Sequence, residues 1–123
     1  MKPYDIISNE PHRAAHKPAV YIYENNATAQ ILKEICAGLE EEGVLYAISS
    51  KENVSTPTLA YAAANHSPLQ VGIGITAHAA ALHMRNCPAE RPVFTLEAAH
   101  ASPQDYRKLG TNAARAVKGG RFV

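Results

Sequence analysis

Residues 69–76, LQVGIGIT, decide the fold. Their apolar side chains recur at every second position, which is the period of a β-strand. Gly72 and Gly74 fall on the opposite side of this strand from Val71 and Ile73. A strand face made of glycine lets another backbone approach closely. The stretch therefore predicts a strand with bulky side chains on one face and a helix or other backbone packed tightly on the other.

The segments before this strand alternate between strand and helix. Residues 19–23 and 44–48 are short apolar runs typical of buried strands. Between them, residues 27–42 place apolar side chains at helical spacing, with Asn25 and Asn26 as candidate caps and Gly43 as the stop. Thr56, as a cap, and Pro57 indicate the start of an alanine-rich helix over residues 57–65.

The segments after it complete the pattern. Residues 80–86 follow too closely for a crossover helix, so a strand there would run antiparallel, although a short helix fits the period equally well. Residues 93–96 predict another strand, and Ser102, Pro103 and Asp105 predict the start of a last helix. This order favours a mostly parallel sheet covered on both faces. Residues 19–123 are expected to form a single domain, and the polar residues 1–18 a flexible N-terminal arm.

The bulk composition excludes several classes of protein. The chain has 123 residues, which suits one domain, and its 12 Lys and Arg against 11 Asp and Glu argue against a nucleic-acid binder. Cys36 and Cys87 form no close pair, so we expect two reduced thiols. Apolar runs are too short for a signal peptide or a membrane span. We therefore expect a cytoplasmic protein that binds no membrane.

The run Glu40-Glu41-Glu42 breaks a local rule. It closes the helix predicted over residues 27–42, where the helix dipole disfavours each exposed carboxylate by about 0.3–1 kcal/mol. At about 100° per residue, Glu41 points almost opposite the apolar stripe, Glu42 lies near its edge and Glu40 is intermediate. Glu41 should face solvent or a partner, where a divalent ion or a cationic surface would offset the cost. A solvated acidic helix end is the simpler interpretation of this pattern alone.

Other polar residues carry weaker signals. Asn112, Arg115 and Lys118 lie three residues apart on the last predicted helix and share one face, which either docks onto a partner or is solvated. His78 and His83 flank one turn and could meet, but no HExxH or H-x-E spacing supports metal catalysis. A small enzyme that uses one of these histidines as an acid or base is therefore kept as an alternative.

Four segments together resemble a known family. They are GLEEEG (38–43), HSPLQVGI (66–73), LHMRNCPAERPVFTL (82–96) and LGTNAARAVKG (109–119), in this order. Over residues 19–122 the chain resembles the small subunit of the diol dehydratase and glycerol dehydratase reactivases. The resemblance implies an α/β fold, a three-layer α/β/α sandwich with a five-stranded mixed, mostly parallel sheet whose fourth strand is antiparallel.

The resemblance also implies partners. Such a small subunit binds a large subunit with an actin- and Hsp70-like ATPase core, two of each chain, and the complex acts on a coenzyme-B12-dependent diol or glycerol dehydratase. The small subunit is thought to trade places with the medium subunit of the dehydratase, so that damaged cobalamin leaves the enzyme. ATP or ADP is bound by the large subunit, so this chain is expected to be non-catalytic.

One metal ligand is implied by the same resemblance. In the family, a glutamate of the E-E-E run completes a Mg²⁺ or Ca²⁺ site whose other ligands come from the large subunit, and it matches Glu41. The partner interface is then expected to include neighbouring residues on both helices: Glu40, Glu42, Asn112, Arg115 and Lys118. One carboxylate is a poor Mg²⁺ site, so metal binding should need the partner.

The sequence alone leaves the client open between a diol and a glycerol dehydratase, and the location open between the cytosol and a bacterial microcompartment. One further alternative is a flavodoxin-like regulatory domain that binds a small molecule at the carboxyl ends of its strands. It predicts a ligand that raises the melting temperature of the isolated chain.

Overall fold

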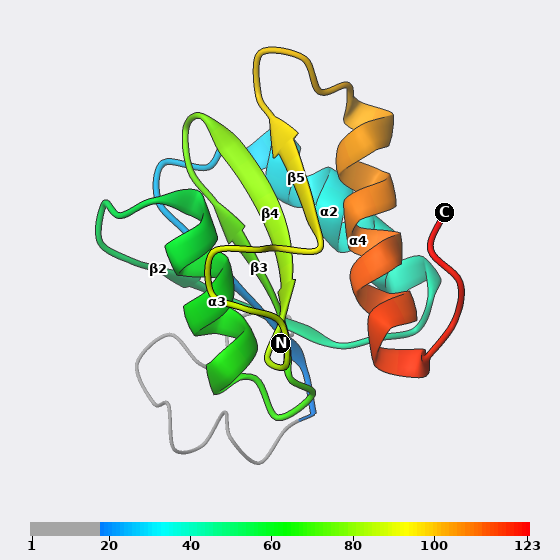
Figure 1. The fold of residues 1–123 in the computed structure, drawn as a ribbon. Helices are drawn as coiled ribbons and strands as arrows, with labels where there is room; N and C mark the ends of the chain where they lie inside the picture. The colour runs from blue at the N-terminus through cyan, green and yellow to red at the C-terminus, as the bar shows by residue number, and fades with distance from the viewer. Residues whose placement is uncertain (1–17) are drawn as a thin grey trace.

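The computed structural model describes residues 18–123, and the predicted arm lies outside the described residues except for Pro18. Five strands and three helices follow one another along the chain (Figure 1). They are β1 (Val20–Glu24), α2 (Ala29–Glu41), β2 (Tyr46–Ser50), α3 (Thr56–His66), β3 (Val71–Ile75), β4 (Ala79–Met84), β5 (Phe94–Glu97) and α4 (Pro103–Lys118). Within residues 18–123, none of the helices is long and apolar enough to cross a membrane.

The strands form one sheet in the order β2-β1-β3-β4-β5. β1 pairs in parallel with β2 and β3, whereas β4 pairs antiparallel with both β3 and β5. β4 therefore runs opposite to the other four strands, which confirms the mixed sheet with an antiparallel fourth strand. A backbone hydrogen bond closes the short β3–β4 turn, in which the N–H of Thr76 donates to the carbonyl of Ala79 over 2.9 Å.

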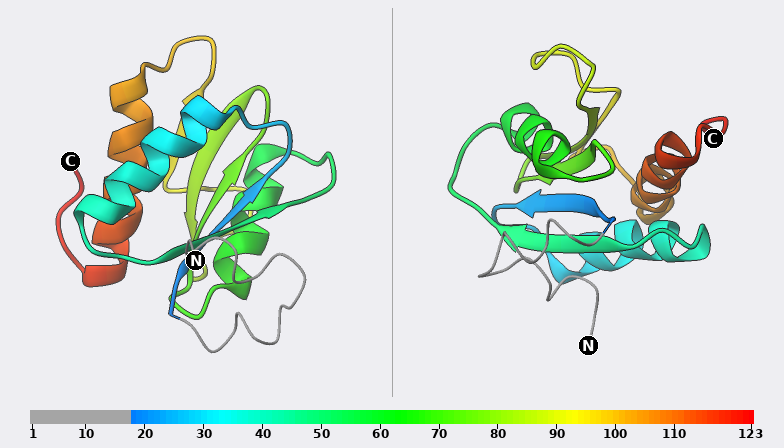
Figure 2. Two further views of the ribbon diagram at one scale, coloured as in Figure 1. Left: turned by 180° about the vertical axis from the view of Figure 1, so that it is seen from behind. Right: turned by 90° about the horizontal axis from the view of Figure 1, so that it is seen from below.

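The helices form one layer on each face of the sheet. Figure 2 shows α3 on one side and α2 with α4 on the other. The chain moves from β1 to β2 in one direction and from β2 to β3 in the opposite direction. Because parallel crossovers are right-handed, their helices α2 and α3 must cover opposite faces. The three-layer α/β/α architecture is thus confirmed.

The face toward α2 and α4 carries the larger apolar core. One row of apolar residues crosses all five strands in register, with Ile73 at its centre on β3. The row consists of Ile48, Ile22, Ile73, Leu82 and Phe94. Ile22, Ile73 and Leu82 are fully buried. Their burial explains why LQVGIGIT alternates as it does, since every second residue of β3 belongs to this core.

The opposite face of β3 is in close contact with α3, as the glycine pattern predicted. A Cβ atom built on Gly72 would lie 2.6 Å from Cβ of Ala63, and one on Gly74 would lie 2.6 Å from the carbonyl oxygen of Thr56. Real Cβ atoms do not approach other atoms this closely. The two glycines and the alanines of α3 therefore let helix and sheet approach more closely than larger side chains would allow.

Two of the three predicted helix starts are wrong in detail. The cap of α2 is Thr28, whose side chain accepts from the N–H of Ile31, rather than Asn25 or Asn26. Asn26 instead adopts a positive φ of 62° in the turn before the helix. α3 is capped by Ser55, one residue before the predicted Thr56. Only α4 starts as predicted, with a capping box between Ser102 and Asp105.

Candidate functional site

The acidic end of α2 lies against α4 because two glycines let the helices touch. A Cβ built on Gly38 of α2 would lie 2.7 Å from the backbone nitrogen of Thr111, and one on Gly110 of α4 would lie 2.9 Å from the carbonyl carbon of Ile35. Neither position has room for a side chain. This contact brings the basic residues of α4 within reach of the carboxylates of α2.

Glu42, the C-cap of α2, is paired with two cations of α4. Lys118 Nζ donates to Oε1 of Glu42 over 3.0 Å and to its carbonyl oxygen over 2.7 Å. Arg115 Nη2 lies 3.6 Å from Oε2 of Glu42. The hydrogen bond from Lys118, with the charges of Lys118 and Arg115, holds the pKa of Glu42 below its ordinary value. Lys118 therefore offsets the negative charge of the Glu42 side chain and also donates to its backbone carbonyl at this helix end.

Glu40 belongs to a partly buried network with β2. Tyr46 Oη donates to Oε2 of Glu40 over 2.6 Å. Burial raises the pKa of Tyr46, and the hydrogen bond to Glu40 raises it further. Burial also raises the pKa of the neighbouring Cys36 thiol to about 11. Cys36 is thus a protonated core residue at neutral pH.

Glu41 is the most exposed member of the ion pairs in this region, with 56% of its side chain accessible. Its Oε2 accepts one hydrogen bond, from Nη1 of Arg107 over 3.0 Å. The outward direction expected for Glu41 is therefore confirmed. The unfavourable charge at the helix end needs no external ion, however, because Arg107, Arg115 and Lys118 of α4 offset it within the chain.

The predicted face of Asn112, Arg115 and Lys118 is only partly exposed. Lys118 is exposed and Arg115 is half-buried, but Asn112 is only 4% accessible. Asn112 Oδ1 accepts from the N–H of Val123 over 2.7 Å, and its amide donates to the Val123 carbonyl over 3.3 Å. The expectation that Asn112 shares an open face is therefore wrong for the chain by itself. Its contact with a partner stays a prediction that requires Val123 to move away.

Arg107 is the functional candidate that the sequence analysis missed. A signal for it was present, because eleven residues at about 100° each bring Arg107 and Lys118 to within about 20° of each other around α4. The spacing along α4 does not predict which residues of α2 these side chains will face. The register of α4 against α2 follows from the Gly38–Gly110 contact.

Substitution of Lys118 should change the titration of Glu42. In Lys118→Gln we expect the pKa of Glu42 to rise toward its ordinary value, because the largest cause of its depression is lost. A depressed carboxyl pKa stabilises the fold above the unfolded pKa, and this stabilisation is lost as the pH falls through the folded pKa. The variant should therefore lose less stability on acidification than the parent.

Carbon-detected NMR titration of the Glu42 carboxyl group measures this shift directly. Lys108→Gln is the matched control, since Lys108 is an exposed lysine of the same helix that acts on Asp105. An unchanged Glu42 titration in Lys118→Gln would show that the ion pair does not persist in solution.

The histidines do not form a catalytic pair. His83 is fully buried, with its ring nitrogens bonded to backbone atoms of Met84 and to the carbonyl of Ala89. His78 precedes β4 at its opposite end, five residues away, so the two α-carbons lie about 16 Å apart along the strand. The two histidines therefore do not meet, because residues 79–82 of the extended strand β4 lie between them.

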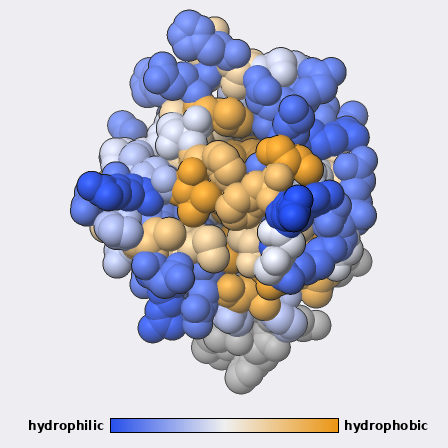
Figure 3. All heavy atoms as spheres, turned by 45° about the vertical axis from the view of Figure 1, so that its right-hand side comes forward, coloured by the Kyte–Doolittle hydropathy of each residue, from blue (hydrophilic) through white to orange (hydrophobic). Residues whose placement is uncertain are grey.

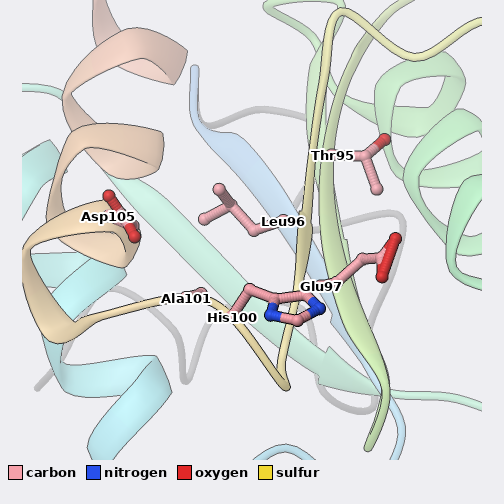
Figure 4. Close-up of a pocket in the computed structure, with 6 residues that line it drawn as sticks. All are labelled: Thr95, Leu96, Glu97, His100, Ala101 and Asp105. Atoms are coloured by element: carbon pink, nitrogen blue, oxygen red, sulfur yellow. The ribbon is translucent and has the colours of Figure 1, made fainter.

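A shallow hollow beside the edge strand β5 offers no better catalytic site. Its lining includes Glu97, His100 and Asp105, and Figure 4 shows Asp105 on α4, across the hollow from His100 and Glu97. Asp105 is engaged in the capping box, where hydrogen bonds from Ser102 hold its pKa below the ordinary value. Across residues 18–123, no three His, Cys, Asp or Glu side chains are grouped so that they could hold a metal ion.

The flavodoxin-like alternative depends on the switch point between β1 and β3. There the N–H of Asn25 donates to the carbonyl of Ile75 over 2.8 Å. The hydroxyl groups of Thr56 and Thr76 pair with each other over 2.7 Å and are buried. These polar groups satisfy one another, so they are not free to bind a ligand at this crevice.

Comparison with known families places the chain. Residues 17–123 match the family described as the dehydratase medium subunit. The chain belongs to this family. Among curated members, it is 39% identical over 102 residues to the propanediol dehydratase-reactivating factor small subunit of Salmonella typhimurium, covering 83% of this chain and 87% of that protein. It is 37% identical to the diol dehydratase-reactivating factor small subunit of Klebsiella michiganensis, covering 83% and 81%.

Solved structures of reactivases share the fold of this family member. The structure of diol dehydratase-reactivating factor complexed with ADP and Mg²⁺ matches with a TM-score of 0.81 and 36% identity, over 87% of this chain and 98% of that chain. A glycerol dehydratase reactivase matches with a TM-score of 0.82 and 32% identity, over 87% and 97%. The resemblance to reactivase small subunits is thus confirmed.

Proposed function

We propose that this chain is the small, non-catalytic subunit of an ATP-dependent reactivating factor for a coenzyme-B12-dependent diol or glycerol dehydratase. Its partner would be a large ATPase subunit, two of each chain, which binds ATP and ADP. By exchanging with the medium subunit of the dehydratase, this chain would let damaged cobalamin leave the enzyme. Its place of action would be the cytoplasm or a bacterial microcompartment. Its similarity to reactivase small subunits over more than 80% of their length supports this assignment.

The exposed carboxylate of Glu41 is the observation that carries the proposal. Glu40 and Glu42 are bound by Tyr46 and by the cations of α4, whereas Glu41 is more than half exposed. Within the described residues, Oε1 of Glu41 accepts no hydrogen bond. Carboxylate oxygens suit Mg²⁺ and Ca²⁺, so Glu41 fits one ligand position of a metal shared with the large subunit.

The surface of the chain also suits a protein partner. Figure 3 shows apolar side chains gathered among hydrophilic ones on the side that carries β5, α4 and the C-terminal segment. The exposed Phe122 packs edge-on against Phe94 there, with ring centroids 5.2 Å apart. Contiguous exposed apolar surface is typical of sites where proteins bind one another.

An exchange mechanism makes an energetic demand that a metal could meet. The reactivase complex and the complex with dehydratase must be close in free energy, because every 1.4 kcal/mol changes the exchange about tenfold. A single ion that bridges Glu41 and the large subunit in one complex alone is enough to change which is favoured.

The test is to express the chain with the large subunit and to measure their association and the recovery of inactivated dehydratase. We expect a complex whose formation is promoted by Mg²⁺ and which restores dehydratase activity with ATP. In Glu41→Gln, association should no longer depend on Mg²⁺, and most of the reactivation should be lost. Glu52→Gln, at an exposed residue of the loop before α3, is the matched control and should behave as the parent. Association and reactivation unchanged in Glu41→Gln would refute the metal role.

A further inference from the structure

Arg107 of α4 joins two carboxylates of α2 that lie two turns apart. Its Nε and Nη2 atoms are each 3.1 Å from Oε1 of Glu34, and its Nη1 atom is 3.0 Å from Oε2 of Glu41. Glu34 and Glu41 are separated by seven residues, so both side chains project from the same face of the helix. One guanidinium group therefore spans the distance between them.

The two ends of this bridge differ in strength. Nε of Arg107 donates a hydrogen bond to Glu34 and Nη2 forms an ion pair with the same oxygen, and the side chain of Glu34 is only 15% accessible. The exposed Glu41 is held by one hydrogen bond, from Nη1. Glu34 is itself fixed, because its Oε2 accepts a hydrogen bond from Nε2 of Gln30 over 3.2 Å. A planar guanidinium fork held at two points keeps its third donor in a defined place. Arg107 is thus anchored at Glu34 and presents Nη1 to Glu41.

The backbone geometry fixes the anchor further. Gly38 faces the carbonyl of Arg107 so closely that a Cβ atom on Gly38 would overlap with it. The backbone of Arg107 therefore lies against α2 at Gly38, a residue between its two carboxylate partners along that helix. Thr111 Oγ1 donates to the same carbonyl over 3.1 Å, one turn further along α4.

This arrangement leaves one oxygen of Glu41 available. Arg107 uses Oε2, and Oε1 accepts no hydrogen bond from the rest of residues 18–123. An unrestrained glutamate at a helix end loses side-chain entropy when a metal fixes it, and a side chain that is already held loses less. Carboxylates that bind metals are usually held by a second hydrogen-bonding group, and loss of that group typically weakens metal binding about 10–100-fold.

From this geometry we propose that Arg107 is a positioning residue, which holds the Glu41 carboxylate through Oε2 so that Oε1 can bind the divalent ion at the subunit interface. The inference rests on the proposed function, because the ion is shared with the large subunit. Arg107 lies outside the acidic run, and its presence should raise the affinity of Glu41 for the ion. Arg107 favours metal binding through orientation, although its charge alone would oppose a cation.

The experiment measures the Mg²⁺ concentration at which the chain half-maximally associates with its large subunit, followed by fluorescence anisotropy of the labelled chain. Arg107→Gln should require about 10–100-fold more Mg²⁺ than the parent. Glu34→Gln, which removes the anchor and keeps Arg107, should shift the requirement in the same direction by a smaller factor. Lys108→Gln removes one positive charge from the same helix without a contact to Glu41 and should leave the requirement unchanged.

Saturating Mg²⁺ distinguishes positioning from misfolding. If Arg107 acts on metal affinity, excess Mg²⁺ should restore association of Arg107→Gln to the parental level, which it would not do for an unfolded chain. An unchanged or lowered Mg²⁺ requirement in Arg107→Gln would overturn the inference. If association of the parent itself is independent of Mg²⁺, or if Glu41→Gln keeps the full requirement, the proposed metal role fails first.

Discussion

Gly110→Ala should destabilise the protein strongly, even though it replaces glycine by the best helix former in the middle of α4. Helix propensity alone predicts a gain of about 1 kcal/mol for such a change. In the structure, however, a Cβ atom at residue 110 would overlap with the backbone of Ile35 on α2. Because the Cβ is fixed to the backbone of α4 and the atoms it meets belong to the backbone of α2, the overlap cannot be relieved by a side-chain rotation. We expect the free energy of unfolding to fall by about 3 kcal/mol, at the upper end for an overpacked core.

Urea denaturation followed by circular dichroism measures this loss, with the midpoint moving to lower urea. Gly120→Ala is the matched control, since a Cβ there would meet its nearest atom at 3.8 Å and the position follows the end of α4. That variant should stay within about 0.5 kcal/mol of the parent. A stabilised Gly110→Ala variant would show that α2 and α4 do not touch at this point.

The interpretation of Gly110 shows what sequence patterns can and cannot predict. In the sequence Gly110 only interrupts the apolar stripe formed by Tyr106, Leu109, Ala113 and Val117. In the fold Gly110 lies at the contact between α4 and α2, next to Gly38, which is 72 residues earlier in the sequence. α4 continues through Gly110 unbroken. Gly72 and Gly74 were interpreted correctly, because the alternation of β3 already separates a glycine face from an apolar face.

The strands were predictable for the same local reason, and the helix caps were less so. An alternating or continuous apolar run is a property of the strand itself, whereas the choice among several possible cap residues depends on tertiary contacts that hold the preceding strand and turn. Asn25, Asn26 and Thr28 are all cap formers, but Asn26 turns with a positive φ of 62° and the N–H of Asn25 donates to the carbonyl of Ile75 on the neighbouring strand β3. That bond holds Asn25 at the end of β1, so α2 begins after Thr28.

At the candidate site, the outward direction of Glu41 was predictable from the sequence, but its ion pair with Arg107 was not. Periodicity around one helix is sufficient to place Glu41 outward. The pairing of Glu41 with Arg107 joins residues 66 positions apart and requires the tertiary contact between α2 and α4. The same contact explains why three carboxylates at a helix end are tolerated, since α4 provides three cations in front of them.

Ile73→Ala should give the other large loss of stability. Ile73 is fully buried on β3, with Ile22 beside it on β1 and Leu82 beside it on β4. Truncation would leave a cavity in the centre of the apolar row, which the rigid sheet and the two helices above it cannot fill by relaxing. We expect the free energy of unfolding to fall by about 4 kcal/mol, within the usual range of 2–5 kcal/mol for a buried isoleucine.

The same row provides the control for this effect. Ile48 occupies its end on the edge strand β2 and is only partly buried, so Ile48→Ala should lose less than half as much stability. Urea denaturation of both variants at low protein concentration gives the comparison, and the dependence of unfolding free energy on urea should stay that of the parent. Equal losses at the two positions would mean that the centre of the sheet is packed no more tightly than its edge. A larger loss at Ile73 would instead place the main source of stability in the strand formed by LQVGIGIT, on the face away from its glycines.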